Sequence, residues 1–164
     1  MQEILPKRKS TRLQGYDYSH AGYYFITICT KDKQAILGQI VGADTSVRPQ
    51  LIKSEIGKIA ENCWHVIERL NENVKTDIFC VMPNHIHGII IIKDSGGQGR
   101  PPLQKIIQSY KSITTRMCFP IGYRQIWQRS YHDHIIRNEA DYQRIWQYID
   151  ENPVRWINDC YYTK

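Results

Sequence analysis

Residues 81–92 read VMPNHIHGIIII and place two histidines at the start of a run of β-branched residues. Such residues favour strands, and alternate side chains of a strand leave the same face. His85 and His87 therefore project together, while Ile86 points the other way. Neutral imidazole is a strong ligand for divalent ions. The spacing predicts half of a metal site, and the alternative is a histidine pair that only closes a strand.

Further strand patterns lie on both sides of this stretch. Aromatic and β-branched residues predict a first strand over residues 22–30. Residues 74–82 and 85–93 predict two strands joined by a Pro83-Asn84 corner, and we expect them to pair antiparallel. Residues 125–136 alternate in polarity and predict a fourth strand.

Helical periodicity occurs between and after these strands. Apolar residues recur at three- and four-residue intervals, the period of an amphipathic helix, in three segments: from Ser54 to Leu70, over residues 101–119, and from Asn138 to Pro153. Ser54 and Asn138 are suitable N-caps. Residues 35–49 contain two glycines around a polar centre and predict a hairpin inserted before the first helix.

The order strand, helix, strand, strand, helix, strand, with a third helix appended, predicts an α+β fold. It is a ferredoxin-like βαββαβ sandwich with an antiparallel sheet, an inserted hairpin and an appended C-terminal helix. Two helices should cover one sheet face, which leaves the other for a ligand and the appended helix. The third strand is central in this fold, so His85 and His87 should lie in mid-sheet. We expect a single domain over residues 1–164, with residues 1–20 as a basic arm within it.

Composition narrows the class of protein. The chain has 164 residues, 41% of them hydrophobic, and a formal net charge of +6, which makes nucleic acid the first partner to consider. No apolar run approaches a membrane-spanning length and no secretory signal is evident, so we expect no membrane partner and a cytoplasmic location. The five cysteines form no CxxC pair, which argues against a disulfide framework and a thiolate zinc site.

The last helix carries two separate rows of side chains. Tyr142, Ile145, Trp146 and Ile149 form a stripe that should dock on the body of the protein. Tyr148 and Asn152 lie one turn apart, on a line about a quarter turn away from that stripe. Asn152 is also explained as a stop residue before a proline, and Tyr148 as an amphipathic side chain at a rim.

The motifs TRLQGYDYSHAGYYFITICT, PNHIHGIII, WQRSYHDHIIRN and IWQYIDENPVRW, in this order, resemble the HUH superfamily of single-tyrosine transposases, most closely the REP-associated tyrosine transposases. The resemblance covers nearly the whole chain. It implies a metal-dependent endonuclease and strand transferase that acts on single-stranded DNA through a covalent 5′-phosphotyrosine. Carried over by position, His85 and His87 hold the metal, Tyr148 is the nucleophile and Asn152 is the third protein ligand. The ion expected is Mg²⁺ or Mn²⁺, because open, oxygen-rich sites suit both and imidazoles favour Mn²⁺.

Basic side chains and further histidines could serve the same reaction. Phosphate contact or packing beside the active site is the expectation for His134, with a second metal pair of His132 and His134 as the alternative. The candidate DNA-binding cations are Lys7, Arg8, Lys9, Arg12, Arg100, Lys105, Lys111 and Arg116. Four tyrosines are candidates for stacking on unpaired bases: Tyr16, Tyr18, Tyr23 and Tyr24.

The resemblance implies a partner DNA strand with a hairpin formed by a palindromic repeat, bound by a monomer or by a homodimer that exchanges helices. The rival function is a non-catalytic RNA- or DNA-binding module, since the same sheet topology carries RNA-binding domains. A domesticated relative that binds repeats without moving DNA is a third candidate.

Overall fold

A four-stranded antiparallel sheet forms the centre of the computed structural model, which describes residues 13–42, 48–94 and 102–162. The strands are β1 (Gly22–Cys29), β4 (Val74–Val81), β5 (His85–Ile92) and β6 (His132–Ile136), in the spatial order β4-β5-β1-β6. This is the order of a ferredoxin-like βαββαβ sheet, so the predicted fold class is confirmed. β5 lies between β1 and β4, which places the two histidines in mid-sheet.

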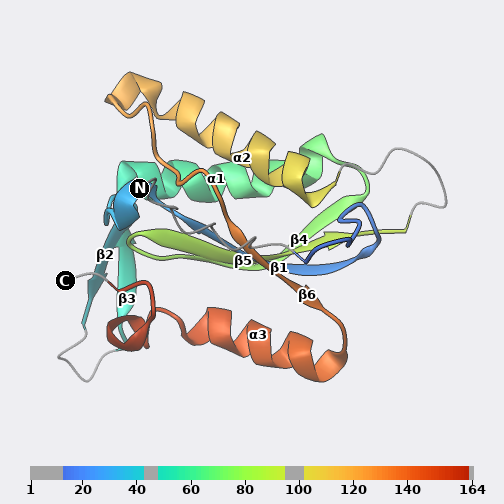
Figure 1. The fold of residues 1–164 in the computed structure, drawn as a ribbon. Helices are drawn as coiled ribbons and strands as arrows, with labels where there is room; N and C mark the ends of the chain where they lie inside the picture. Colours follow the sequence, from blue (N-terminus) through green and yellow to red (C-terminus); the bar gives the residue numbers. More distant parts are fainter. Residues whose placement is uncertain (1–12, 43–47, 95–101, 163–164) are drawn as a thin grey trace, which may run out of the picture.

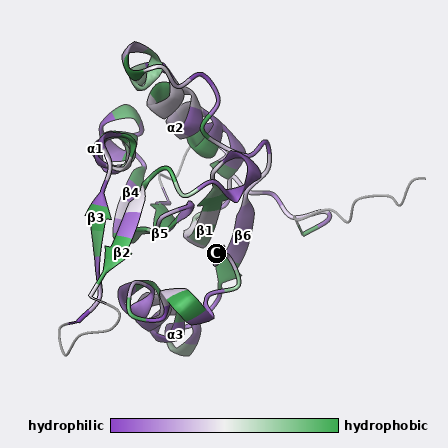
Figure 2. Cartoon of the chain, turned by 90° about the vertical axis from the view of Figure 1, so that its left-hand side faces the viewer, coloured by the Kyte–Doolittle hydropathy of each residue, from purple (hydrophilic) through white to green (hydrophobic). Residues whose placement is uncertain are grey.

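Helices cover both faces of the sheet. α1 (Glu55–Leu70) and α2 (Leu103–Met117) lie on one face and α3 (Glu139–Glu151) lies on the other, as Figure 1 shows. Figure 2 shows the same three layers from the side. The larger core cluster joins the sheet to α1 and α2, and a smaller cluster around Ile89, Ile145 and Ile149 joins it to α3. The appended helix therefore docks on the face that the first two helices leave uncovered.

The inserted hairpin and the fourth strand have different bounds from those predicted. β2 (Gly38–Val41) pairs antiparallel with β3 (Gln50–Lys53), so a hairpin is present but extends beyond the predicted range. β6 begins at His132 instead of residue 125, and the earlier part forms only one bridge, between Trp127 and Thr30. The carbonyls just before β6 accept hydrogen bonds from the Lys111 side chain of α2, which is why this segment follows α2 and not the sheet.

Both predicted helix caps are present. The Ser54 hydroxyl accepts a hydrogen bond from the Gly57 backbone N–H at 3.1 Å, and the Asn138 side chain accepts one from the Asp141 backbone N–H at 2.9 Å. The predicted stripe of α3 was wrong in one member, because Trp146 is 39% exposed. The buried side of α3 instead includes Asn152 and part of Tyr148, the two residues that the sequence pattern placed apart from the core-facing stripe.

Burial corrects the expectation for two of the tyrosines. Tyr18 and Tyr24 lie in the larger core cluster, so they are not available to stack on bases as predicted, whereas Tyr23 is exposed.

All five cysteines are free thiols, as their spacing indicated. No helix among the described residues has both the length and the apolar character needed to cross a bilayer.

The two faces of β5 have separate roles. Ile86, Gly88 and Ile90 face α1 and α2, while His85 and His87 face α3. The Trp64 ring of α1 lies directly over Gly88, where an added Cβ atom would meet ring carbons at 2.4 and 2.8 Å. Trp64 has no room to retreat, because it is fully buried and stacks on Phe79 with ring centroids 4.6 Å apart.

We therefore predict that Gly88→Ala lowers the free energy of unfolding by about 1–3 kcal/mol, the usual cost of overfilling a core. Urea denaturation monitored by circular dichroism measures it. Gly22→Ala is the matched control, since its Cβ would meet the Tyr24 ring at an ordinary 3.7 Å, and should change stability little. Equal stability of the two variants would contradict the close packing described.

Candidate active site

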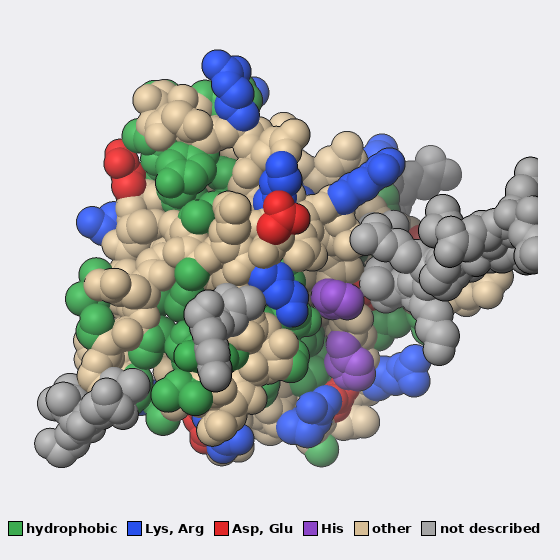
Figure 3. Space-filling model, turned by 60° about the vertical axis from the view of Figure 1, so that its left-hand side comes forward, with side chains coloured by type: hydrophobic (Ala, Val, Ile, Leu, Met, Phe, Trp, Pro, Cys, Tyr) green, Lys and Arg blue, Asp and Glu red, His purple; other side chains and the backbone are tan. Residues whose placement is uncertain are grey.

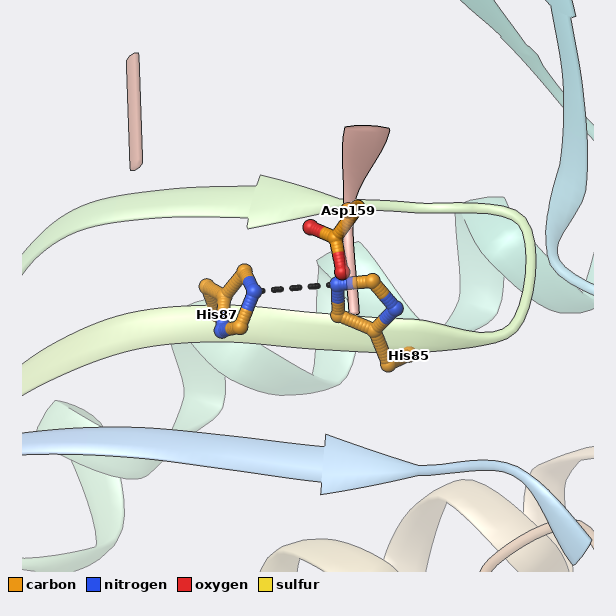
Figure 4. A group of neighbouring side chains, drawn as sticks. All are labelled: His85, His87 and Asp159. Carbon is orange, nitrogen blue, oxygen red and sulfur yellow. Dashed lines mark hydrogen bonds between the residues drawn. The ribbon is translucent and has the colours of Figure 1, made fainter. Parts of the chain in front are cut away.

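The two histidines of β5 converge on one point. Their Nε2 atoms lie 3.0 Å apart, and both rings project from the same face of the strand, as Figure 4 shows. His85 pairs in register with Cys29 and His87 with Thr27, so both are anchored to β1 at the centre of the sheet. Two Nε2 atoms this close fit donation to a common cation.

Neighbouring polar groups fix the direction of each ring. His85 Nδ1 lies 2.8 Å from Asn84 Oδ1, and the Asn84 amide nitrogen donates to the Tyr161 carbonyl, which sets the orientation of the amide. His85 Nδ1 therefore donates its proton and Nε2 keeps a lone pair. His87 Nδ1 lies 2.9 Å from the Thr27 hydroxyl. Contacts of this kind orient metal-binding imidazoles in proteins.

Burial keeps both rings neutral. His85 and His87 are almost inaccessible to solvent. Desolvation, with a further contribution from the Lys33 charge, lowers the pKa of His85 to about 3. Desolvation and the neighbouring His85 lower the pKa of His87 well below its ordinary value. Neutral imidazole is the form that binds a cation, so this pair needs no proton loss before binding at neutral pH.

α3 carries the sequence-predicted tyrosine and asparagine, and it brings the tyrosine to the histidines. The Tyr148 hydroxyl lies 3.3 Å from His87 Nε2, and the Phe25 ring contacts both the Tyr148 and His87 rings. Asn152 is buried one turn later. Its Nδ2 donates to Asp159 Oδ2 at 2.9 Å, whereas its Oδ1 has no hydrogen-bond partner among the described residues.

Asp159 is a site residue that the sequence reasoning missed. It follows the short helix η3 (Trp156–Asn158), and one carboxylate oxygen lies within 4.8 Å of a nitrogen of each histidine. Figure 4 shows its carboxylate directed at the gap between the rings. No spacing in the sequence links Asp159 to His85, because the link is made by the turn after α3. Among the described residues, this is the only group of three histidine, cysteine or acidic side chains with metal-site spacing, so His132 and His134 do not form a second one.

The donor set suits a divalent cation. A buried amide oxygen without a partner is costly, and Asn152 Oδ1 is such an atom, in a side chain whose amide nitrogen donates to Asp159 beside the histidines. Two imidazoles, an amide oxygen and a nearby carboxylate match Mn²⁺ or Mg²⁺ better than a closed structural zinc site. His85, His87 and either Asn152 or Asp159 are the side chains that could hold the ion.

The Tyr148 phenol is protonated in this environment. Desolvation raises its pKa above the ordinary value, and the negative charge of Asp159 raises it further. A phenol with a raised pKa is a weak nucleophile at neutral pH. A nucleophilic role for this hydroxyl would need a base or nearby positive charge.

The site is closed on one side and open on the other. Tyr161 packs on both histidine rings, and Trp156 lies 5.9 Å from the His85 ring, so the segment after α3 covers the pair. On the open side, a pocket of about 330 Å³ reaches His87 and Tyr148. His134, the predicted neighbour of the site, lines this pocket.

A second concave surface is basic. A groove of about 850 Å³ runs between α2 and the segment before β6, and its charged lining comprises Lys31, Asp32, Lys111, Arg116, Arg124 and Arg129. Lys111 is held by the carbonyls of Gln128 and Ser130, so its charge is partly used within the fold. Of the other predicted DNA-binding cations, Lys105 and Arg116 are exposed on α2. The remaining five lie outside the described residues: Lys7, Arg8, Lys9, Arg12 and Arg100.

Comparison with known proteins gives a consistent result. The family model of the IS200-like transposases matches residues 19–152, a range that includes both histidines, Tyr148 and Asn152 but not Asp159. An uncharacterized protein of Haemophilus influenzae is 35% identical over 174 residues, covering 95% of this chain and 93% of that protein. Another Haemophilus influenzae protein, assigned as a REP-associated tyrosine transposase, is 23% identical and covers 85% and 74% of the two chains.

Solved structures share the fold. A REP-associated tyrosine transposase bound to a REP hairpin superposes with a TM-score of 0.64 at 19% identity, over 90% of this chain and 74% of that chain. A protein of Deinococcus radiodurans R1 assigned as a transposase gives a TM-score of 0.51 at 17% identity, over 85% and 95%. At these identities the similarity establishes the common architecture.

The contact between Thr27 and His87 provides a test of the metal site. We predict that Thr27→Val weakens Mn²⁺ binding roughly 10-fold or more, because the His87 ring loses the partner that orients it. Titration followed by electron paramagnetic resonance measures the affinity. Thr114→Val removes a buried hydroxyl of α2 far from the histidines and should leave the affinity unchanged. Wild-type affinity in Thr27→Val would show that this contact does not support a metal site.

Proposed function

This chain belongs to the IS200-like transposase family, and from that premise we propose that it is a metal-dependent endonuclease and strand transferase for single-stranded DNA. One observation carries the proposal: α3 delivers the Tyr148 hydroxyl to within 3.3 Å of His87 Nε2. In the proposed site, one chain supplies both the nucleophile and the histidine pair.

Tyr148 is the proposed nucleophile. Its phenolic oxygen attacks a backbone phosphorus, forming a phosphotyrosine bond as the bond from phosphorus to the 3′-oxygen breaks. The 5′-phosphate remains on Tyr148, and the departing 3′-oxygen takes up a proton and becomes a free hydroxyl. The phosphotyrosine retains the energy of the broken bond, so attack by a second 3′-hydroxyl can rejoin DNA without ATP.

The surrounding side chains support this chemistry. His85, His87 and Asn152 would hold Mg²⁺ or Mn²⁺, which when bound would polarise the phosphate and offset its developing negative charge. Phe25 packs edge-on against the Tyr148 ring with centroids 6.0 Å apart and holds it beside His87. Asp159 Oδ2 lies 3.5 Å from the Tyr148 hydroxyl and is the acceptor for its proton once His87 Nε2 is occupied.

The basic groove along α2 is the proposed surface for a DNA hairpin. A structurally similar transposase was solved with a REP hairpin, and this chain offers an exposed, largely cationic groove. Cations bind the phosphates of a duplex stem without reading its sequence.

The decisive test is a covalent adduct. We predict that wild-type protein with Mn²⁺, mixed with a hairpin-bearing single strand from palindromic repeats beside the gene, gives a protein–DNA band in a denaturing gel. Tyr148→Phe should abolish the band, because phenylalanine has no oxygen to attack phosphorus. Tyr142→Phe is the matched control, since the Tyr142 hydroxyl bonds to Asp77 away from the site, and should retain the band. A wild-type protein that only shifts the strand in a native gel would be a binding module instead.

The groove makes a separate prediction. Arg116→Ala and Arg129→Ala should each weaken hairpin binding several-fold and reduce the slope of log affinity against log salt by about 1, as expected for one lost phosphate contact. Fluorescence anisotropy at several salt concentrations measures both quantities. Arg69→Ala removes an exposed cation of α1 outside the groove and should change neither. An unchanged slope in the two groove variants would place the hairpin elsewhere.

A further inference from the structure

We propose that the pocket beside Tyr148 binds a backbone phosphate of the single strand, and that His134 and Arg144 hold this phosphate. The inference rests on the proposed function and adds residues to it. It starts from the pocket of about 330 Å³, whose lining includes His87, Tyr148, His134 and Arg144. The first two lie at the proposed reaction centre, and the last two bring an imidazole and a guanidinium to it from outside the metal site.

Both residues are positioned by the elements that build the reaction centre. Arg144 precedes Tyr148 by one turn of α3, so the two side chains lie in one row of the helix. His134 pairs in register with Phe25, the residue whose ring contacts both Tyr148 and His87. A phosphate in this pocket would therefore lie beside the His134 imidazole, the Arg144 guanidinium and the Tyr148 hydroxyl.

A single carboxylate holds the two side chains. Asp141 Oδ2 lies 2.7 Å from His134 Nε2, and Asp141 Oδ1 lies 2.6 Å from an Arg144 terminal nitrogen. In its protonated form His134 donates from Nε2 to Asp141 and has Nδ1 left as a second donor, which is the form proposed to hold the phosphate. The Arg144 guanidinium has five N–H donors, so its bond to Asp141 leaves donors for a second anion.

Folding stability does not account for the contacts of His134 and Arg144 with Asp141. The His134 and Arg144 side chains are 50% and 68% exposed, and exposed ion pairs contribute little to folding. Figure 3 shows histidine, lysine and arginine side chains close together on one face of the molecule.

The chemistry of the pocket selects an anion. Among the described residues that line it, none is acidic, and Asp141 contacts His134 and Arg144 without being part of the lining. The Phe25 and Tyr161 rings add aromatic surface for an unpaired base. A phosphate with an attached nucleotide, as in single-stranded DNA, matches both features.

The test measures binding without cleavage. In a Tyr148→Phe background, the affinity for fluorescein-labelled oligothymidylate is followed by anisotropy at several NaCl concentrations with Mn²⁺ present. Arg144→Ala and His134→Ala should each raise Kd several-fold and flatten the salt slope by about 0.7, the value for one phosphate of a single strand. His134→Gln retains a side-chain donor for Asp141 but carries no charge, and should behave as His134→Ala does.

Arg155→Ala is the matched control. Arg155 is 66% exposed and pairs with a helix carboxylate, as Arg144 does, but it does not line the pocket. Wild-type slopes in Arg144→Ala and both His134 variants would overturn the proposal, and so would an equal loss in Arg155→Ala. The proposed function is judged separately, by adduct formation in the protein with Tyr148 intact, so an adduct alongside unchanged slopes would reject only the phosphate site.

Discussion

The docking of α3 on the sheet is the contact on which the site depends. Ile145 and Ile149 pack against Ile89 of β5, two residues beyond His87. Because Tyr148 and Asn152 lie on the same side of the helix as these isoleucines, burying the apolar row also brings the Tyr148 phenol to His87 and the Asn152 amide to Asp159. A substitution that loosens the contact between α3 and the sheet would therefore also separate Tyr148 from His87.

Burial of polar groups at this site has a cost in stability. Two imidazoles are almost fully removed from water with their Nε2 atoms 3.0 Å apart, and the buried Asn152 Oδ1 lacks a partner among the described residues. A buried polar atom without a partner destabilises a fold and is typical of places where function opposes stability. A cation held by the histidines and Asn152, as proposed, would offset this cost.

Basic side chains outside the histidine pair lie on two surfaces, the groove beside α2 and the pocket beside Tyr148. The groove beside α2 presents exposed arginines without contacting the histidines, whereas the pocket containing His134 and Arg144 opens onto His87 and Tyr148. This division agrees with a strand held by its stem on one surface while a neighbouring phosphate enters the reaction centre. Lys111 lines the groove, but its ammonium group donates to carbonyls of the segment that leads into β6 and so joins that segment to α2.

Local pattern in the sequence determined the element order, the ferredoxin-like topology, both helix caps and the shared face of His85 and His87, because each depends on spacing within one strand or helix. The family resemblance added Tyr148 and Asn152. Tertiary structure alone decided that Trp146 faces outward, that Tyr18 and Tyr24 are buried, that β6 is short, and that Thr27, Asn84, Asp141 and Asp159 support the site residues. Most of these features are set by contacts between separate elements, and the angle at which two elements pack leaves no periodic signal in either sequence.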